Sequence, residues 1–116
     1  MNDQAIAPKV YHDYKDCIAA CLKCATVCYH SAMSAVNEGP QETLSCAPKD
    51  LECATICTAT AQLMSMGGTY AGRLCKLCAE VCEECAVMSE SYKIQHCQEC
   101  AETCRLCVIE CDKLAA

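Results

Sequence analysis

The sequence has no Trp and no Phe, and it contains only five Tyr, four Gly and three Pro among 116 residues. Large aromatic rings therefore cannot supply its core. Small disulfide-linked domains are rich in loops, and loops need Gly and Pro. The scarcity of both residues favours long helices instead. The length fits one domain.

Excess positive charge and long apolar runs are also absent. The net charge is -6, whereas binding to nucleic acid needs a basic surface. No uncharged apolar run reaches the roughly 18 residues of a membrane-spanning helix. Residues 1–9 lack the basic start and the apolar stretch of a secretory signal. We therefore expect a cytoplasmic chain with neither a nucleic-acid nor a membrane partner.

Cysteine is the residue that the chain has in abundance, with 16 copies. In a reducing compartment these residues should be thiols. An even number is also compatible with complete pairing in disulfides, so the count alone does not decide between the two states. The spacing of the cysteines along the chain is the informative feature.

Residues that end helices divide the chain into four segments. Strong stops are the Asn-Glu-Gly-Pro of residues 37–40 and the Gly pair 67–68, and the polar residues 89–92 form a weaker one. The segments between the stops are rich in Ala, Leu, Glu, Lys and Met, which favour helix. These predicted helices span residues 10–36, 41–66, 69–90 and 92–114.

Pro48 leaves two readings of the second segment. It lies either in the first turn of a helix that follows a short turn over residues 41–47, or at a kink in a longer helix. In both cases the short connections make successive helices antiparallel. The expected fold is all-α, an antiparallel up-and-down four-helix bundle that forms a single domain over residues 1–116.

The cysteines follow the helical repeat. Within each segment every gap between cysteines is 3, 4 or 7 residues, so they form one stripe on each predicted helix. The stripes comprise Cys17, Cys21, Cys24 and Cys28; Cys46, Cys53 and Cys57; Cys75, Cys78, Cys82 and Cys85; and Cys97, Cys100, Cys104, Cys107 and Cys111. In an ordinary bundle such a stripe is aliphatic and faces inward. The sequence therefore predicts a core lined with sulfur.

Three explanations of the stripes can be compared. Cysteine can be a small core hydrophobe, but Ala, Val or Leu would fill 16 core positions without the risk of oxidation. Disulfides within a helix are disfavoured because Cβ atoms three or four residues apart lie about 5–6 Å apart, against about 3.8 Å in a disulfide. Disulfides between helices stay possible. A metal between two thiolates fits best, since two metal–sulfur bonds of about 2.3 Å span about 4.6 Å.

Soft thiolates select Cu(I), Zn(II) or iron–sulfur clusters. Zinc sites group four ligands on separated knuckles, and cluster ligands lie on loops and often end beside Pro. The stripes here are continuous, lie within helices, and contain no Cys that precedes Pro. Cu(I) accepts two or three shared thiolates, which gives a loading on the order of one Cu(I) per Cys. A zinc store and an iron–sulfur carrier are the alternatives.

The repeated stripes resemble those of the bacterial copper storage proteins. The similarity covers nearly the whole chain and is clearest in residues 75–85 (CKLCAEVCEEC) and 97–111 (CQECAETCRLCVIEC). The resemblance implies a Cys-lined four-helix bundle of the cytosolic branch, a homotetramer, and storage of many Cu(I) ions for copper homeostasis and detoxification. The second stripe is sparse and has Met64 seven residues after Cys57, so the number of ions is not carried over from relatives.

The expected ligands are all 16 cysteines together with His96, which lies about 60° from the Cys direction on its helix. In an up-and-down bundle His96 shares one end with five other residues: Cys28, Cys46, Cys85, Met88 and Ser89. We expect copper to enter at this end. The opposite end resembles a plug of apolar and small residues: Val10, Tyr14, Met64, Gly68, Ala71 and Leu114.

Four other candidates are interpreted as packing or surface residues. Met64 faces inward and is read as core filler, and Met88 as packing. His12 and His30 fall off the Cys faces and are read as surface residues. The pattern contains no Ser/His/Asp set and no phosphate loop. A single His96–Cys97 pairing is weak support for a nucleophile, so we expect no enzyme.

Apolar residues also form stripes outside the Cys faces. On the first helix they are Ile18, Leu22, Ala25, Tyr29 and Met33, and on the third they are Leu74, Leu77, Val81 and Met88. A helix with two apolar faces has two packing partners. These stripes therefore predict contacts with neighbouring helices or with other copies of the chain. The outer face of the fourth helix, with Glu99, Glu102, Arg105 and Glu110, and the pair Glu83–Glu84 are predicted to be solvated.

Overall fold

The computed structural model describes residues 11–115, and Val10, which the sequence analysis assigned to the plug, lies outside this range. The described chain contains four α-helices and one 3₁₀ helix. They are α1 (Tyr11–Asn37), η2 (Gln41–Cys46), α2 (Ala47–Ser65), α3 (Ala71–Glu90) and α4 (Gln95–Asp112). The four predicted helices are confirmed, with boundaries shifted by a few residues.

The connections explain where the helices end. Gly39 and Gly67 both have positive φ angles, +79° and +63°, which a residue without a Cβ adopts at little cost. After α2, Gly67 N–H donates to Met64 O and Gly68 N–H to Leu63 O, which closes the helix end. Pro48 lies in the first turn of α2, directly after η2. The first of the two readings of the second segment is therefore confirmed.

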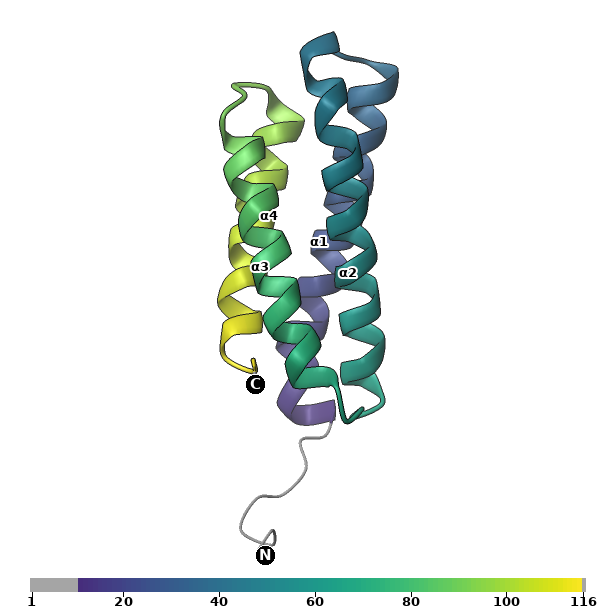
Figure 1. Cartoon of the computed structure of the whole chain (residues 1–116), viewed down its shortest axis with the longest axis vertical. Helices are drawn as coiled ribbons and strands as arrows, with labels where there is room; N and C mark the ends of the chain where they lie inside the picture. Colours follow the sequence, from purple (N-terminus) through teal and green to yellow (C-terminus); the bar gives the residue numbers. More distant parts are fainter. Residues whose placement is uncertain (1–10, 116) are drawn as a thin grey trace, which may run out of the picture.

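The helices form an antiparallel bundle (Figure 1). Each helix packs against two others: α1 and α3 both pack against α2 and against α4. The α1–η2 and α3–α4 connections lie at one end of the bundle, and the α2–α3 turn lies at the other (Figure 1). No helix within residues 11–115 is both long enough and apolar enough to cross a membrane. This topology brings the Cys-bearing faces of all four helices to one axis.

Small residues allow the helices to approach closely around that axis. Apart from the cysteines, the buried core consists largely of alanines. Four of them are 0% exposed: Ala32, Ala54, Ala71 and Ala86. Larger apolar side chains such as Val27 and Leu63 cover the core from its flanks. With few large rings available, the core is built mainly from thiols and alanine methyl groups.

Charged residues connect the helices on the outside. Arg105 of α4 forms ion pairs with Glu83 and Glu90 of α3, at 2.9 Å and 2.7 Å. Lys49 of α2 pairs with Glu84 of α3 at 2.9 Å. Exposed ion pairs of this kind contribute little to stability, roughly 0–1 kcal/mol each. They agree with the predicted solvated faces of α3 and α4.

Candidate metal centre

All 16 cysteines are free thiols and all are buried, with no side chain more than 3% exposed. They lie on the inward faces of the helices and of η2, as the 3, 4 and 7 spacing predicted. We call the row of thiols along the bundle axis the sulfur column. The prediction of a core lined with sulfur is confirmed.

Neighbouring sulfur atoms in the column are close but not bonded. Between helices, the Sγ–Sγ distance is 3.6 Å for Cys17–Cys111, 3.6 Å for Cys53–Cys82 and 3.7 Å for Cys28–Cys100. Within a helix, i and i+4 pairs such as Cys24–Cys28 and Cys107–Cys111 are 3.9 Å apart. The expected pairing of sulfurs along one helix is therefore present, but most close pairs join different helices.

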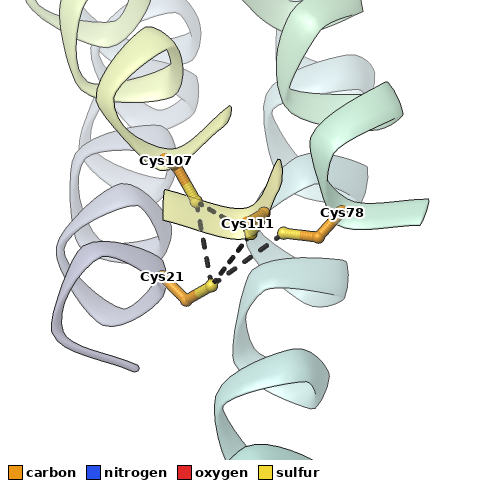
Figure 2. A group of neighbouring side chains, drawn as sticks. All are labelled: Cys21, Cys78, Cys107 and Cys111. Atoms are coloured by element: carbon orange, nitrogen blue, oxygen red, sulfur yellow. Dashed lines mark hydrogen bonds between the residues drawn. The ribbon is translucent and has the colours of Figure 1, made fainter. Parts of the chain in front are cut away.

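Five groups of four thiols have all of their sulfur atoms within 4.8 Å of one another. Each group takes its thiols from three helices. The groups overlap, since Cys24, Cys57 and Cys82 each belong to two of them. Figure 2 shows the group nearest the α2–α3 turn, in which Cys21 of α1, Cys78 of α3 and Cys107 and Cys111 of α4 point toward one another. The sites are therefore not separate: they form one continuous set of potential ligands.

The sulfur spacing suits a soft metal ion. With metal–sulfur bonds of about 2.3 Å and trigonal angles, ligand sulfurs lie about 4.0 Å apart. The observed distances of 3.6–4.0 Å, for example 3.6 Å for Cys57–Cys82 and 4.0 Å for Cys21–Cys78, are already close to this value. Three-coordinate Cu(I) would therefore fit with small side-chain adjustments.

Asp50 is a buried carboxylate that the sequence analysis missed. It is 1% exposed, and its Oδ1 accepts hydrogen bonds from Cys85 Sγ at 3.2 Å and Cys100 Sγ at 3.6 Å. Its Oδ2 has no partner among the described residues. Burial, and next the nearby Cys100, raises the pKa of Asp50 to about 7. Its position between Cys46 and Cys53, at gaps of four and three, was the signal that could have revealed it.

The end of the bundle that holds His96 also holds Cys46 and Cys97, and we call these three residues the mouth. His96 Nδ1 lies 3.0 Å from Ser31 Oγ and 3.7 Å from Cys97 Sγ. Its Nε2 is buried and has no hydrogen-bond partner in the described chain. Burial, and next the charges of Cys46 and Asp50, raises the pKa of the Cys97 thiol to about 11.

A surface cleft adjoins the mouth. Its volume is about 480 Å³, and it is lined by His30, Ser34, Glu38, Gly39, Ile94, Gln95, His96 and Glu99. His96 thus separates an open, partly acidic cleft from the first thiols of the column. The structure brings His96 close to the cysteines, as its position on the helix predicted.

The opposite end, near the α2–α3 turn, is closed by fully buried sulfur atoms and apolar groups. Met64 Sδ lies 3.6 Å from Cys75 Sγ, and both residues are 0% exposed. Tyr14 covers this end and is 5% exposed. Burial, and next the neighbouring Cys75, raises the pKa of its hydroxyl. We call Tyr14, Met64 and Cys75, with Cys17 and Cys111, the closed end.

The other singled-out residues lie where the sequence placed them. His12 and His30 are exposed, and Met88 is half-buried and packs against the core. The apolar stripe of α1 divides in two: Ile18 and Ala25 are buried, whereas three members are exposed to solvent. The exposed members are Leu22 at 49%, Tyr29 at 45% and Met33 at 50%.

Comparison with known proteins gives a consistent family assignment. Residues 10–116 match the family model described as Csp, copper storage protein. A cysteine-rich protein of Bacillus subtilis named YhjQ, itself described as uncharacterized, is 36% identical over 101 residues, which are 86% of this chain and 94% of that protein.

Solved structures of similar sequence have the same fold. The Cu(I)-bound copper storage protein BsCsp3 superposes with a TM-score of 0.86 at 34% identity, over 90% of this chain and 99% of that one; the apo form of this storage protein comes from Bacillus subtilis. A cytosolic copper storage protein of Streptomyces lividans with five coppers gives a TM-score of 0.82 at 32% identity, over 89% of this chain and 92% of that one. The Streptomyces protein has also been loaded with 10 copper equivalents.

Proposed function

Because the chain belongs to the copper storage protein family, we propose that its sulfur column holds many Cu(I) ions and that the protein sequesters copper in the cytoplasm. The observation that carries this function is the set of 16 buried thiols. All of them except Cys46, Cys75 and Cys97 have another thiol sulfur 3.6–4.0 Å away. Cu(I) is the cargo of the protein, and its number is on the order of one per Cys when thiolates are shared.

Charge balance favours such dense loading. Each Cu(I) that replaces a thiol proton leaves the net charge of the core unchanged. A divalent ion must displace two thiol protons to leave the core neutral, so charge balance allows only about one Zn(II) for every two cysteines. The shared membership of the four-thiol groups also favours a metal that accepts bridging thiolates. The column therefore suits Cu(I) better than Zn(II).

The proposed ligands are the 16 cysteines, with Asp50 and His96 as oxygen and nitrogen donors near the mouth. Asp50 Oδ1 already points at two thiols of the column. The unpartnered Nε2 of His96 and the cleft beside it support the mouth as the copper entrance. Copper that enters there meets Cys97 and Cys46 before it reaches the four-thiol groups.

Further parts of the proposal concern the state of the protein. The whole chain acts as one copper-binding domain and catalyses no reaction, because the column offers ligands but no site where a substrate meets a positioned acid or base. It assembles as a homotetramer. Val36, which is 52% exposed, extends the apolar stripe of α1 beyond Tyr29 and Met33, and this exposed apolar surface supports such an interface.

A competition between metals tests the function. The reduced chain is mixed, without oxygen, with equal and limiting amounts of Cu(I) and Zn(II), then desalted, and both metals are measured by mass spectrometry. The proposal predicts that nearly all of the protein-bound metal is copper and that most of the zinc is removed by desalting. Retention of zinc in preference to copper would instead support the zinc store, and a coloured protein containing iron after expression would support the iron–sulfur carrier.

A further inference from the structure

We propose that the closed end of the sulfur column is a Cu(I) site in which the thioether of Met64 is a ligand beside the thiolate of Cys75. This inference rests on the proposed storage of Cu(I) and adds a ligand of a different chemical type to it. The two sulfur atoms, Met64 Sδ and Cys75 Sγ, lie 3.6 Å apart, and neither residue is exposed to solvent.

Helix α2 supplies no thiol at the closed end of the bundle. Its inward stripe continues after Cys57 with Thr60 and Met64. The group in Figure 2 accordingly takes its thiols from α1, α3 and α4 alone. Beyond that group, Met64 is the sulfur that α2 contributes to the column.

The orientation of Met64 suits a ligand. A methionine that only fills space can turn either its sulfur or its methyl group toward its neighbours. Here the sulfur itself is within hydrogen-bonding distance of the Cys75 thiol. A separation of 3.6 Å is close to the roughly 4.0 Å between two sulfurs on one trigonal metal, so a small rotation would let both atoms bind the same ion.

The chemistry of a thioether fits this location. Thioethers are soft donors that select Cu(I), and they bind without losing a proton. Binding would release one proton from the Cys75 thiol to the buffer, and copper would remain monovalent throughout. The resulting Cu(I)–thiolate–thioether unit is neutral, which favours it at an end that Tyr14 shields from water.

The environment also defines the remaining donors. The thiols of Cys17 and Cys111 are 3.6 Å apart at the same end, and both interact with Cys75. None of the five four-thiol groups includes Cys17 or Cys75. The Met64 thioether therefore adds a donor beside Cys17 and Cys75, which belong to no four-thiol group. The ion bound here lies farthest from the mouth.

Selenium provides a direct test. The protein is made with selenomethionine in a background in which Met33, Met66 and Met88 are leucine, so that the selenium atoms are at Met64 and Met1. It is loaded anaerobically with Cu(I), and selenium-edge X-ray absorption is recorded. The proposal predicts a copper atom at bonding distance from selenium in the loaded protein and none in the apo protein. The same background with Met64→Leu should show no copper neighbour.

A second measurement uses capacity. Met64→Leu keeps the volume of the side chain, and Met66→Leu changes a residue that is 70% exposed. In competition with a Cu(I) chelator, the Met64 variant should retain on the order of one Cu(I) fewer per chain than the Met66 variant. Full copper loading with only carbon neighbours around selenium would overturn the role of Met64 and leave storage intact. A chain that binds no Cu(I) would overturn both proposals.

Discussion

The Oδ1 atom of Asp50 lies 3.2 Å from the Sγ atom of Cys85, inside a core that consists mainly of thiols and alanine side chains. A carboxylate in such a place is poorly solvated, and its Oδ2 has no partner among the described residues. Its raised pKa, about 7, follows from that burial. The pair places a hard oxygen donor next to the soft donors of the column.

The first prediction concerns the stability of the apo protein. Because the folded-state pKa of Asp50 is raised from 3.8 to about 7, the folded chain binds more protons than the unfolded chain between these values. The free energy of unfolding should therefore fall as the pH rises from 4 to 7, by up to about 4 kcal/mol, and then level off. Urea unfolding of the reduced protein at several pH values measures this.

Asp50→Asn is the matched control, since it keeps the shape and removes the titration. Its stability should change less between pH 4 and pH 7 than that of the unchanged protein, and it should be the more stable of the two at pH 8. If the free energy of unfolding depended equally on pH in both proteins, other groups would cause the dependence. The ionisation of Asp50 would then not destabilise the fold.

The second prediction concerns protons released during loading. The pKa of Cys97 is raised to about 11, first by burial, so this thiol is protonated at neutral pH and must release its proton to the buffer when it binds copper. The apparent affinity for Cu(I) should therefore fall as the pH falls, by about tenfold per pH unit for each proton released. Chelator competition at pH 6.5, 7.5 and 8.5 tests this, and an affinity that does not change with pH would argue against thiolate ligands.

The third prediction separates the mouth from the column. His96→Ala removes the imidazole between the cleft and Cys97, and His30→Ala removes an exposed imidazole from the same cleft. Copper transfer from a chelator should be several-fold slower in the His96 variant, with nearly full final capacity. The His30 variant should load at the normal rate. Equal rates in both variants would place the copper entrance elsewhere.

The fourth prediction addresses assembly. The double change Tyr29→Glu and Met33→Glu puts charge into the exposed apolar stripe of α1. Its mass by light scattering should fall from that of a tetramer to that of a monomer, while the number of Cu(I) ions per chain stays the same. The control variant Met66→Glu, changed at the C-terminal end of α2, should remain a tetramer. A tetramer that survives the double change would show that the α1 stripe is not the interface.

Much of the fold could be predicted because its local signals agree. Gaps of 3, 4 and 7 fix the inward face of each helix, and Gly67 and Pro48 mark a helix end and a helix start. The same periodicity placed Met64 inside, where it is 0% exposed. These features depend on residues close in sequence, so the pattern was sufficient.

Other parts depend on how helices meet, which periodicity does not encode. Which thiols approach each other across the axis, such as Cys17 and Cys111, is set by the lengths of the connections and the shift of one helix along another. A pattern of thiols does not single out Asp50, because its side chain is a carboxylate, although its spacing fits the stripe. The outer face of α4 was expected to be solvated and charged, yet Leu106 and Ile109 are more than half exposed there, at 56% and 53%.

Anaerobic titration of the reduced protein with Cu(I), in the presence of a competing chelator, tests the central claim most directly. A column of shared thiolates predicts tight binding that continues well beyond four ions per chain, toward one Cu(I) for each of the 16 cysteines. Saturation near four ions, the number that separate tetrahedral sites would hold, would contradict it.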